Sequence, residues 1–319
     1  MKKNYLVMLI VLTLLISNFL LVGISAEQED FPTKPVEIII PFSVGGSGDI
    51  LSRALAPILE TYLGVPVICV TADGGSGAVG IARLMSLPAD GYAIFHSSST
   101  LPYTLASGGI EGDPYDLLPL VHVSGAPQVM SALTDSSYET FEDFVAYAKD
   151  NPGVVCGGSH INGTNHIFFL KLMDAVGIEA TYIPYTGGGE NMLGLLGKDI
   201  EAGFSSAAPP LPYVQSGEVR ILGVTGSERD HNYPDAPTFK ELGYPEVEQD
   251  NLWRGFFIKK GTPQHIVDKW REAFAKAVKD ERWEKYINSV ADVTMFLSGN
   301  DFEEVYFDTL ETGYKYFGN

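Results

Sequence analysis

Short glycine- and serine-rich segments follow apolar runs in this chain and could supply many hydrogen-bond donors. The apolar run 37–42 leads into SVGGSG at 43–48, and a helical pattern starts at Asp49. Residues 153–156 similarly precede a loop that ends in GTNH at 163–166. Free backbone N–H groups and the helix N-termini behind such loops attract anions, and hydroxyl groups donate strong hydrogen bonds to carboxylates. The pattern therefore predicts reversible capture of a small anion, with no cofactor, no metal and no catalysis.

The candidate ligand-binding residues all lie at the end of a predicted strand or in the loop that follows it. They are Ser43, Gly45, Gly46, Ser47, Asp49, Gly74, Ser97, Ser98, Gly163, Thr164, Asn165, His166, Tyr185 and Ser205. Two of them have a second interpretation. Asp49 begins an amphipathic helix and is also expected to cap it or to accept the N–H groups of the Gly45–Gly46 loop. His166 could equally cap or pack within the first turn of its helix.

The elements that must position these residues alternate between strand, loop and helix. This alternation covers residues 31–101 and returns over 153–224, which predicts two parallel α/β layers. The carboxyl ends of parallel strands are where such sheets bind ligands. Two clusters of loops, one in each half of the chain, predict a cleft that holds the anion from both sides. The tail after Thr262 is predicted to be helical.

Other chemistries fit these segments less well. GSGAVG at 75–80 matches a dinucleotide-binding fingerprint, but the next strand ends in HSS at 96–98 and offers no acid for a ribose. The same loop approximates a nucleophile elbow with Ser76, so an exported serine hydrolase is the alternative function. His160 and His166 lack the motifs of a metal site.

Composition and the amino terminus limit the compartment and the partners. The net charge of −19 excludes a nucleic-acid binder that relies on a general basic surface. Lys2 and Lys3 precede an apolar stretch at 5–22, and small residues lead to Ala26, which predicts a signal peptide over 1–26 and a periplasmic protein. If uncleaved, the same stretch would anchor the chain in a membrane. Cys69 and Cys156 are expected to be buried thiols rather than a disulfide.

A series of short motifs occurs along nearly the whole mature chain. They are KP at 34–35, PF at 41–42, GG at 45–46 with Asp49 and Arg53, PADGY at 88–92, GTNH at 163–166, PYTGGG at 184–189, PTFKELGYP at 237–245 and GTP at 261–263. In order and spacing, this series resembles the extracytoplasmic solute-binding proteins of tripartite tricarboxylate transporters, the Bug family. Val44 stands where the family usually has a proline, and TAD at 71–73 replaces the usual asparagine.

The resemblance implies an α/β, two-lobed periplasmic-binding-protein fold of type II, a Venus flytrap in which each lobe is a mostly parallel sheet flanked by helices. Lobe 1 is expected to comprise residues 27–125 plus 251–319, and lobe 2 residues 126–250. The loops at 43–49 and 163–166 would hold a small organic carboxylate: a di- or tricarboxylate, an aromatic acid or an amino acid. Delivery to the membrane permease of a tripartite transporter by a monomer is expected. A ligand-sensing role in a signalling system is a further alternative.

Overall fold

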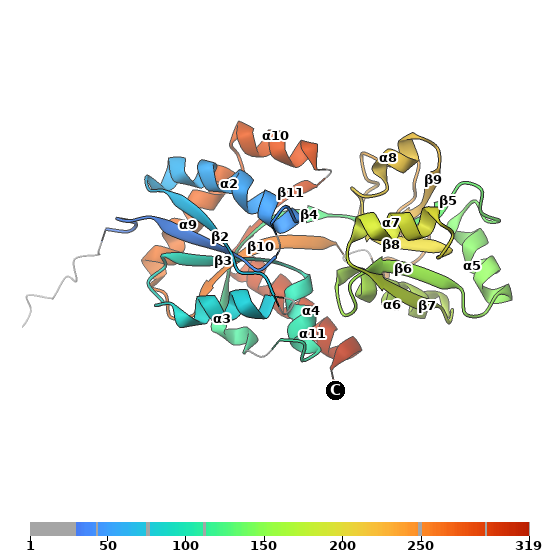
Figure 1. The fold of residues 1–319 in the computed structure, drawn as a ribbon, viewed down its shortest axis with the longest axis horizontal. Helices are drawn as coiled ribbons and strands as arrows, with labels where there is room; N and C mark the ends of the chain where they lie inside the picture. Colours follow the sequence, from blue (N-terminus) through green and yellow to red (C-terminus); the bar gives the residue numbers. More distant parts are fainter. Residues whose placement is uncertain are drawn as a thin grey trace, which may run out of the picture. The chain divides into compact units, whose positions relative to one another are not determined.

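The computed structural model describes residues 30–42, 44–74, 77–110, 113–247, 251–290 and 292–318 (Figure 1). The predicted signal peptide, residues 1–26, lies outside these ranges. The chain divides into two compact units, Met1–Thr33 and Lys34–Asn319, and every element below belongs to the second unit. Among the described residues, none of the helices is long and apolar enough to span a membrane.

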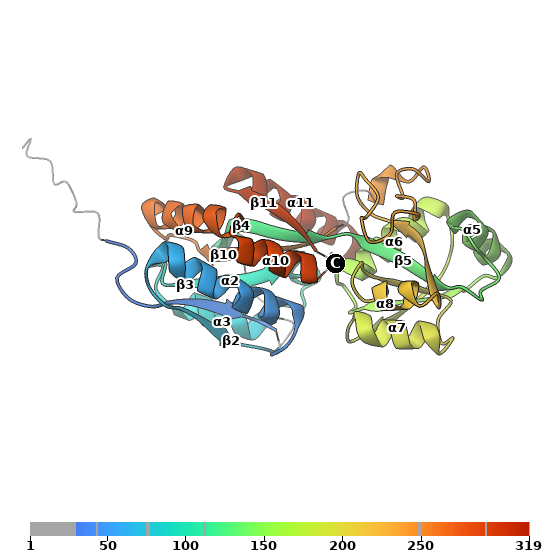
Figure 2. The same cartoon turned by 90° about the horizontal axis from the view of Figure 1, so that it is seen from above.

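One sheet of the described chain has six strands in the order β11-β4-β10-β3-β1-β2. They are β1 (Val36–Ile40), β2 (Val67–Thr71), β3 (Ala93–Ser98), β4 (Leu117–Ala126), β10 (Leu252–Lys259) and β11 (Val293–Ser298). One face carries α2 (Ser47–Leu63), α9 (Gln264–Ala277) and α10 (Glu281–Ser289), and the other carries α3 (Ala78–Ser86), α4 (Thr100–Ala106) and α11 (Asn300–Phe317) (Figures 1 and 2). A 3-10 turn, η2 (Pro114–Asp116), precedes β4.

The other sheet has five strands in the described chain, in the order β7-β6-β8-β5-β9. They are β5 (Gln128–Leu133), β6 (Val155–Ser159), β7 (Thr181–Tyr185), β8 (Ala202–Ser206) and β9 (Val219–Val224). The helices α5 (Phe141–Asp150) and α6 (Thr164–Val176) pack with η3 (Pro245–Val247) in an aromatic-rich core, and α7 (Gly188–Leu196) packs in a separate apolar cluster. The short helix α8 (Leu211–Gln215) lies near β9.

Both sheets are mixed, which corrects the expectation of mostly parallel sheets within a confirmed α/β fold. The strands β1, β2 and β3 are parallel, as are β6, β7 and β8, whereas β4, β5, β9, β10 and β11 form antiparallel pairs. Parallel neighbours need a crossover helix between them. The chain instead runs from β4 through Pro127 into β5, so one nearly continuous extended segment serves both sheets. The direction of β4 and β5 in their sheets is therefore determined by the course of this segment from one sheet to the other.

Helix ends follow local signals in the sequence. Helix α5 starts after Thr140, whose side chain caps it and forms a reciprocal capping box with Asp143. Helix α2 ends at Gly64, whose φ of 75° is left-handed and suits glycine.

The two cysteines are free: Cys156 is buried in the core around α5 and α6, and Cys69 is half-buried in β2. Burial raises the pKa of Cys69 to about 11.

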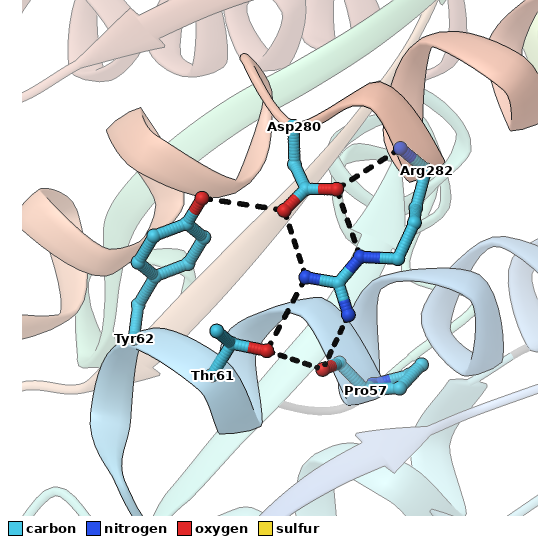
Figure 3. A network of polar contacts seen from close by, with 5 residues as sticks. All are labelled: Pro57, Thr61, Tyr62, Asp280 and Arg282. Carbon is cyan, nitrogen blue, oxygen red and sulfur yellow. Dashed lines mark hydrogen bonds and ion pairs between the residues drawn. The ribbon is translucent and has the colours of Figure 1, made fainter.

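The C-terminal part of α2 is fastened to the start of α10 by a polar network (Figure 3). Arg282 donates three hydrogen bonds to the Asp280 carboxylate, from Nε at 2.8 Å, from a terminal nitrogen at 2.7 Å and from its backbone N–H at 2.9 Å. The Arg282 guanidinium also donates to Pro57 O at 3.3 Å and to Thr61 Oγ1 at 3.2 Å, and the Tyr62 hydroxyl donates to Asp280. The network therefore joins two helices that lie on the same face of the six-stranded sheet.

Candidate ligand-binding site

The β1–α2 loop folds back onto the first turn of its own helix through Asp49. The Asp49 carboxylate is 2% exposed and accepts the Gly45 N–H at 3.0 Å and the Arg53 Nε–H at 2.8 Å. The hydrogen bond from Arg53 lowers the pKa of Asp49, with the Gly45 N–H acting in the same direction against burial. These are the contacts expected of an acceptor that holds the glycine loop closed, and they occupy both carboxylate oxygens.

We expect Asp49→Ala to lower the free energy of unfolding by about 1–3 kcal/mol, because the Gly45 N–H and the Arg53 side chain lose a buried acceptor. Urea unfolding of the variant and its parent measures the loss. Glu272→Ala is the matched control, because it breaks another ion pair between residues four apart on a helix, the pair with Lys276. Both of those side chains are more than half exposed, so this loss should be about 1 kcal/mol or less. Equal losses in both variants would contradict a loop-holding role for the carboxylate.

Thr164, at the start of α6, touches residues that follow β3 in the other sheet. Its hydroxyl lies 2.9 Å from Ser99 Oγ and 3.2 Å from Thr100 Oγ1. Thr164 and Ser99 are buried, and Thr100 is half-buried. The predicted set contains Thr164 but stops at Ser98 on the other side. The HSSST sequence at 96–100 indicates a strand end rich in donors, but which of its hydroxyl groups faces the other sheet cannot be predicted from the sequence.

The predicted serines on strands are embedded in the sheets. Ser97 and Ser98 are the last residues of β3 and pair with Gly255 and Arg254 of β10. Ser205, in β8, donates its hydroxyl to the Ser206 carbonyl at 2.9 Å. Exposure is 9% or less for all of them. These serines are therefore buried at the ends of strands and are not exposed on the surface of the loops.

Asn165 and His166 make extensive contacts within the protein. The Asn165 Oδ1 accepts hydrogen bonds from Ser159, and its Nδ2 donates to Gln128 Oε1 at 2.6 Å. His166 Nδ1 accepts the Asn162 N–H at 3.1 Å. The His166 ring stacks on Phe317 at 5.5 Å, and burial lowers its pKa to about 4. His166 is therefore neutral at physiological pH and packs among aromatic rings.

Tyr185 and Gly74 also have local structural contacts. The Tyr185 ring packs toward α7, where a Cβ added to Gly194 would lie 2.2 Å from the phenol oxygen. The Gly74 carbonyl accepts the N–H of Gly77 at 3.1 Å, and its φ of 137° favours glycine. Two predicted residues, Ser43 and the candidate nucleophile Ser76, lie outside the described ranges.

Neutral donors dominate this part of the molecule. The segments that follow the parallel strands, 43–49, 72–78, 96–101, 159–166 and 186–190, contain no lysine or arginine. Arg254, in β10, is the pairing partner of Ser98 at the end of β3, but its charge is already paired with Asp292. Within the described ranges no group of three or more His, Cys, Asp or Glu side chains could hold a metal ion. The arrangement suits hydrogen bonding to a small anion.

Comparisons with known proteins identify relatives over most of the chain. The family model described as the tripartite tricarboxylate transporter family receptor matches residues 51–310 of this chain. The UPF0065 protein of the gbd 5′ region of Cupriavidus necator is 34% identical over 260 residues, which cover 79% of this chain and 77% of that protein. BugT of Bordetella pertussis is 31% identical over 252 residues, 77% of each chain.

Solved structures share the fold. A TctC solute-binding protein from Polaromonas, crystallised without ligand, has a TM-score of 0.79 and 27% identity over 90% of this chain and 98% of its own. Two proteins from Rhodopseudomonas palustris have the same fold: MatC with bound malate (TM-score 0.75, 19% identity, 89% and 99% covered) and a protein with adipate (0.77, 23%, 90% and 97%). The family membership that the motifs predicted is confirmed: this chain belongs to the tripartite tricarboxylate transporter receptor family.

Proposed function

We propose that this protein captures a small organic carboxylate outside the cytoplasm and delivers it to the membrane permease of a tripartite transporter. The observation that carries the proposal is the contact of Thr164, at the start of α6, with Ser99 and Thr100 after β3, which joins donor segments of the two sheets. The N-cap residues of α2 and α6 are Gly46 and Gly163, which have no side chain to cap the helix. The first N–H groups of both helices are thus left for an anion. Family membership supports the compartment.

Some of the predicted site residues take one of two roles in this proposal, as direct donors or as supports of those donors. Direct donors are the β1–α2 loop backbone and Ser47, apart from the Gly45 N–H that Asp49 accepts, the hydroxyl groups of Ser99 and Thr100, and the start of α6 with Thr164. Asp49, Asn165 and His166 support these donors, because their polar atoms contact the protein itself. Ser99 and Thr100 extend the predicted set, and their contact with Thr164 is the reason.

Closure of two lobes around the ligand completes the proposal. The proposed lobe 1, residues 27–125 plus 251–319, would include the six-stranded sheet except for Ala126 at the end of β4. The proposed lobe 2, residues 126–250, would include the five-stranded sheet. The chain passes between the sheets at Pro127 and again before Leu252, so two segments could act as a hinge. A ligand that contacts both lobes only when they are closed shifts the population toward the closed state. We propose that the protein works as a monomer.

A ligand screen tests the function. The mature protein, refolded to remove retained ligand, is heated with malate, adipate, citrate, aromatic acids and amino acids, and the midpoint of unfolding is measured. A ligand at 100 times its dissociation constant adds about 2.7 kcal/mol, which is several degrees at this size. Stabilisation by one class of acid supports the proposal. A flat response to every acid, with hydrolysis of an ester substrate by the same sample, would favour the serine hydrolase instead.

Removing the Thr164 hydroxyl should weaken binding of the acid found in that screen. Thr164→Val keeps the shape of the side chain but loses a donor, and we expect the binding free energy to fall by about 1–3 kcal/mol. Isothermal titration calorimetry measures it. Thr134→Val is the control, because the Thr134 hydroxyl bonds to the Gly217 carbonyl at the far end of β5. Equal affinity in the Thr164 variant and its parent would exclude this hydroxyl as a ligand donor.

A further inference from the structure

Polar groups, of which Gln128 and Thr225 are buried and Asn251 is half-buried, connect the two segments in which the chain passes between the sheets. Gln128 begins β5 directly after Pro127, Thr225 follows β9, and Asn251 precedes β10. The Gln128 N–H donates to Thr225 Oγ1 at 2.8 Å, and the Thr225 N–H donates to the Gln128 carbonyl at 2.8 Å. The Thr225 hydroxyl donates to Asn251 Oδ1 at 2.7 Å. The two passages are therefore linked through a single side chain, Thr225.

The Gln128 side chain extends this network to the first turn of α6. Gln128 is fully buried, and its Oε1 accepts a hydrogen bond from Asn165 Nδ2 at 2.6 Å. Asn165 is 8% exposed, and its Oδ1 accepts hydrogen bonds from Ser159 at the end of β6. Both ends of the Asn165 amide are thus held by protein, which fixes the orientation of this side chain.

Thr164 precedes Asn165 in the same helical turn and faces the other sheet. Its hydroxyl contacts Ser99 and Thr100. Consecutive residues in one turn share a rigid backbone, so the orientation of Asn165 determines where the Thr164 hydroxyl reaches. A continuous set of contacts therefore runs from Asn251 through Thr225 and Gln128 to the turn that carries Thr164.

We propose that Gln128 is a positioning residue for ligand binding. Through Asn165 it holds Thr164 in place, and through Thr225 it couples that position to the two segments that pass between the sheets. The inference rests on the proposed function, since Thr164 must be a ligand donor for the coupling to affect affinity. Gln128 itself does not touch the ligand.

Gln128→Met tests the inference, because methionine is of similar size and cannot accept the Asn165 N–H. With adipate and malate as probes, we expect affinity to fall roughly three- to tenfold, the equivalent of one hydrogen bond. In a double-mutant cycle with Thr164→Val, the two losses should not add, because Gln128 acts through that hydroxyl. Additive losses would show that Gln128 affects binding by another route and would overturn the inference.

Hydrogen exchange of the ligand-free protein gives a second measurement that needs no ligand. The amides of residues 167–169, which bond within the first turns of α6, should exchange faster in Gln128→Met. Ser131→Ala is the matched control: it removes another fully buried hydrogen bond of β5, from Ser131 Oγ to the Gly203 carbonyl at 3.1 Å, away from α6. It should leave both the affinity and the exchange at 167–169 unchanged.

The two measurements separate the inference from the proposed function. Unchanged exchange at 167–169 in Gln128→Met would overturn the positioning role, whether or not a carboxylate binds. Faster exchange in a protein that binds no acid of the screen would support the network and contradict the carboxylate function. Similar effects in Gln128→Met and Ser131→Ala would reduce Gln128 to a general contributor to stability and overturn the inference.

Discussion

Asp292→Ala is expected to lower the free energy of unfolding by about 3–5 kcal/mol, since it leaves a buried guanidinium without its counter-ion. The Asp292 carboxylate accepts a hydrogen bond from Arg254, and the two side chains are only 5% and 8% exposed. Arg254 lies in β10 opposite Ser98 of β3 and Ser124 of β4. Asp292 directly precedes β11, so the ion pair fastens the edge strand to β10 across β4.

Urea unfolding measures this loss, and a double variant provides the control. Arg254→Met with Asp292→Leu removes both charges together, and apolar replacement of a buried pair is often neutral or stabilising. We therefore expect the double variant to regain most of the stability that Asp292→Ala loses. If Asp292→Ala costs less than about 1 kcal/mol, the pair behaves like an exposed one and the argument from burial is wrong.

The sequence is sufficient to predict the strand–loop–helix units but not the full order of the strands. The units at 36–63 and 155–176 have short loops between neighbouring elements, so local pattern determines them. The β4, β10 and β11 strands pair with partners far away in the chain. A strand that passes between two sheets has the same apolar pattern as a strand inside one sheet. Pattern alone therefore did not distinguish mixed sheets from mostly parallel ones.

The candidate site shows the same division between local and distant information. The interaction of Asp49 with Gly45 spans four residues and could be predicted from the start of an amphipathic helix. The bond between Ser99 and Thr164 joins residues 65 positions apart. Likewise, Gln128 has no feature in the sequence that marks it as a partner of Asn165. Donor-rich loops can be recognised from the sequence, whereas the pairs that they form depend on the tertiary fold.

Acidification should destabilise the protein through histidines that are buried in a neutral state. Burial lowers the pKa of His96 to about 3, with nearby Arg254 adding to the shift, and neither ring nitrogen of His96 has a hydrogen-bond partner among the described residues. Burial also lowers the pKa of His122 to about 4, against a hydrogen bond from its Nε2–H to the Ser124 carbonyl at 2.9 Å. Exposed histidine titrates near pH 6.5, so below that pH the unfolded chain binds protons that the folded chain does not.

The stability that these histidines contribute is complete above pH 6.5 and is lost as the pH falls toward their folded pKa values. Each should contribute a loss of about 2 kcal/mol between pH 7.5 and pH 5. His122→Gln retains a side-chain donor for the Ser124 carbonyl but does not titrate, so its loss over this interval should be about 2 kcal/mol smaller than that of the parent.

Asp292 affects the pH dependence in the opposite direction, because burial raises the pKa of its carboxyl group. This contribution is present in both His122→Gln and its parent, so it cancels when the two proteins are compared. Ser131→Ala is the control for general destabilisation, because it weakens the core without removing a titrating group. Urea unfolding at a series of pH values gives the free energy for each protein. If His122→Gln and its parent lose the same stability on acidification, His122 is protonated in the folded state and the burial argument for this residue is wrong.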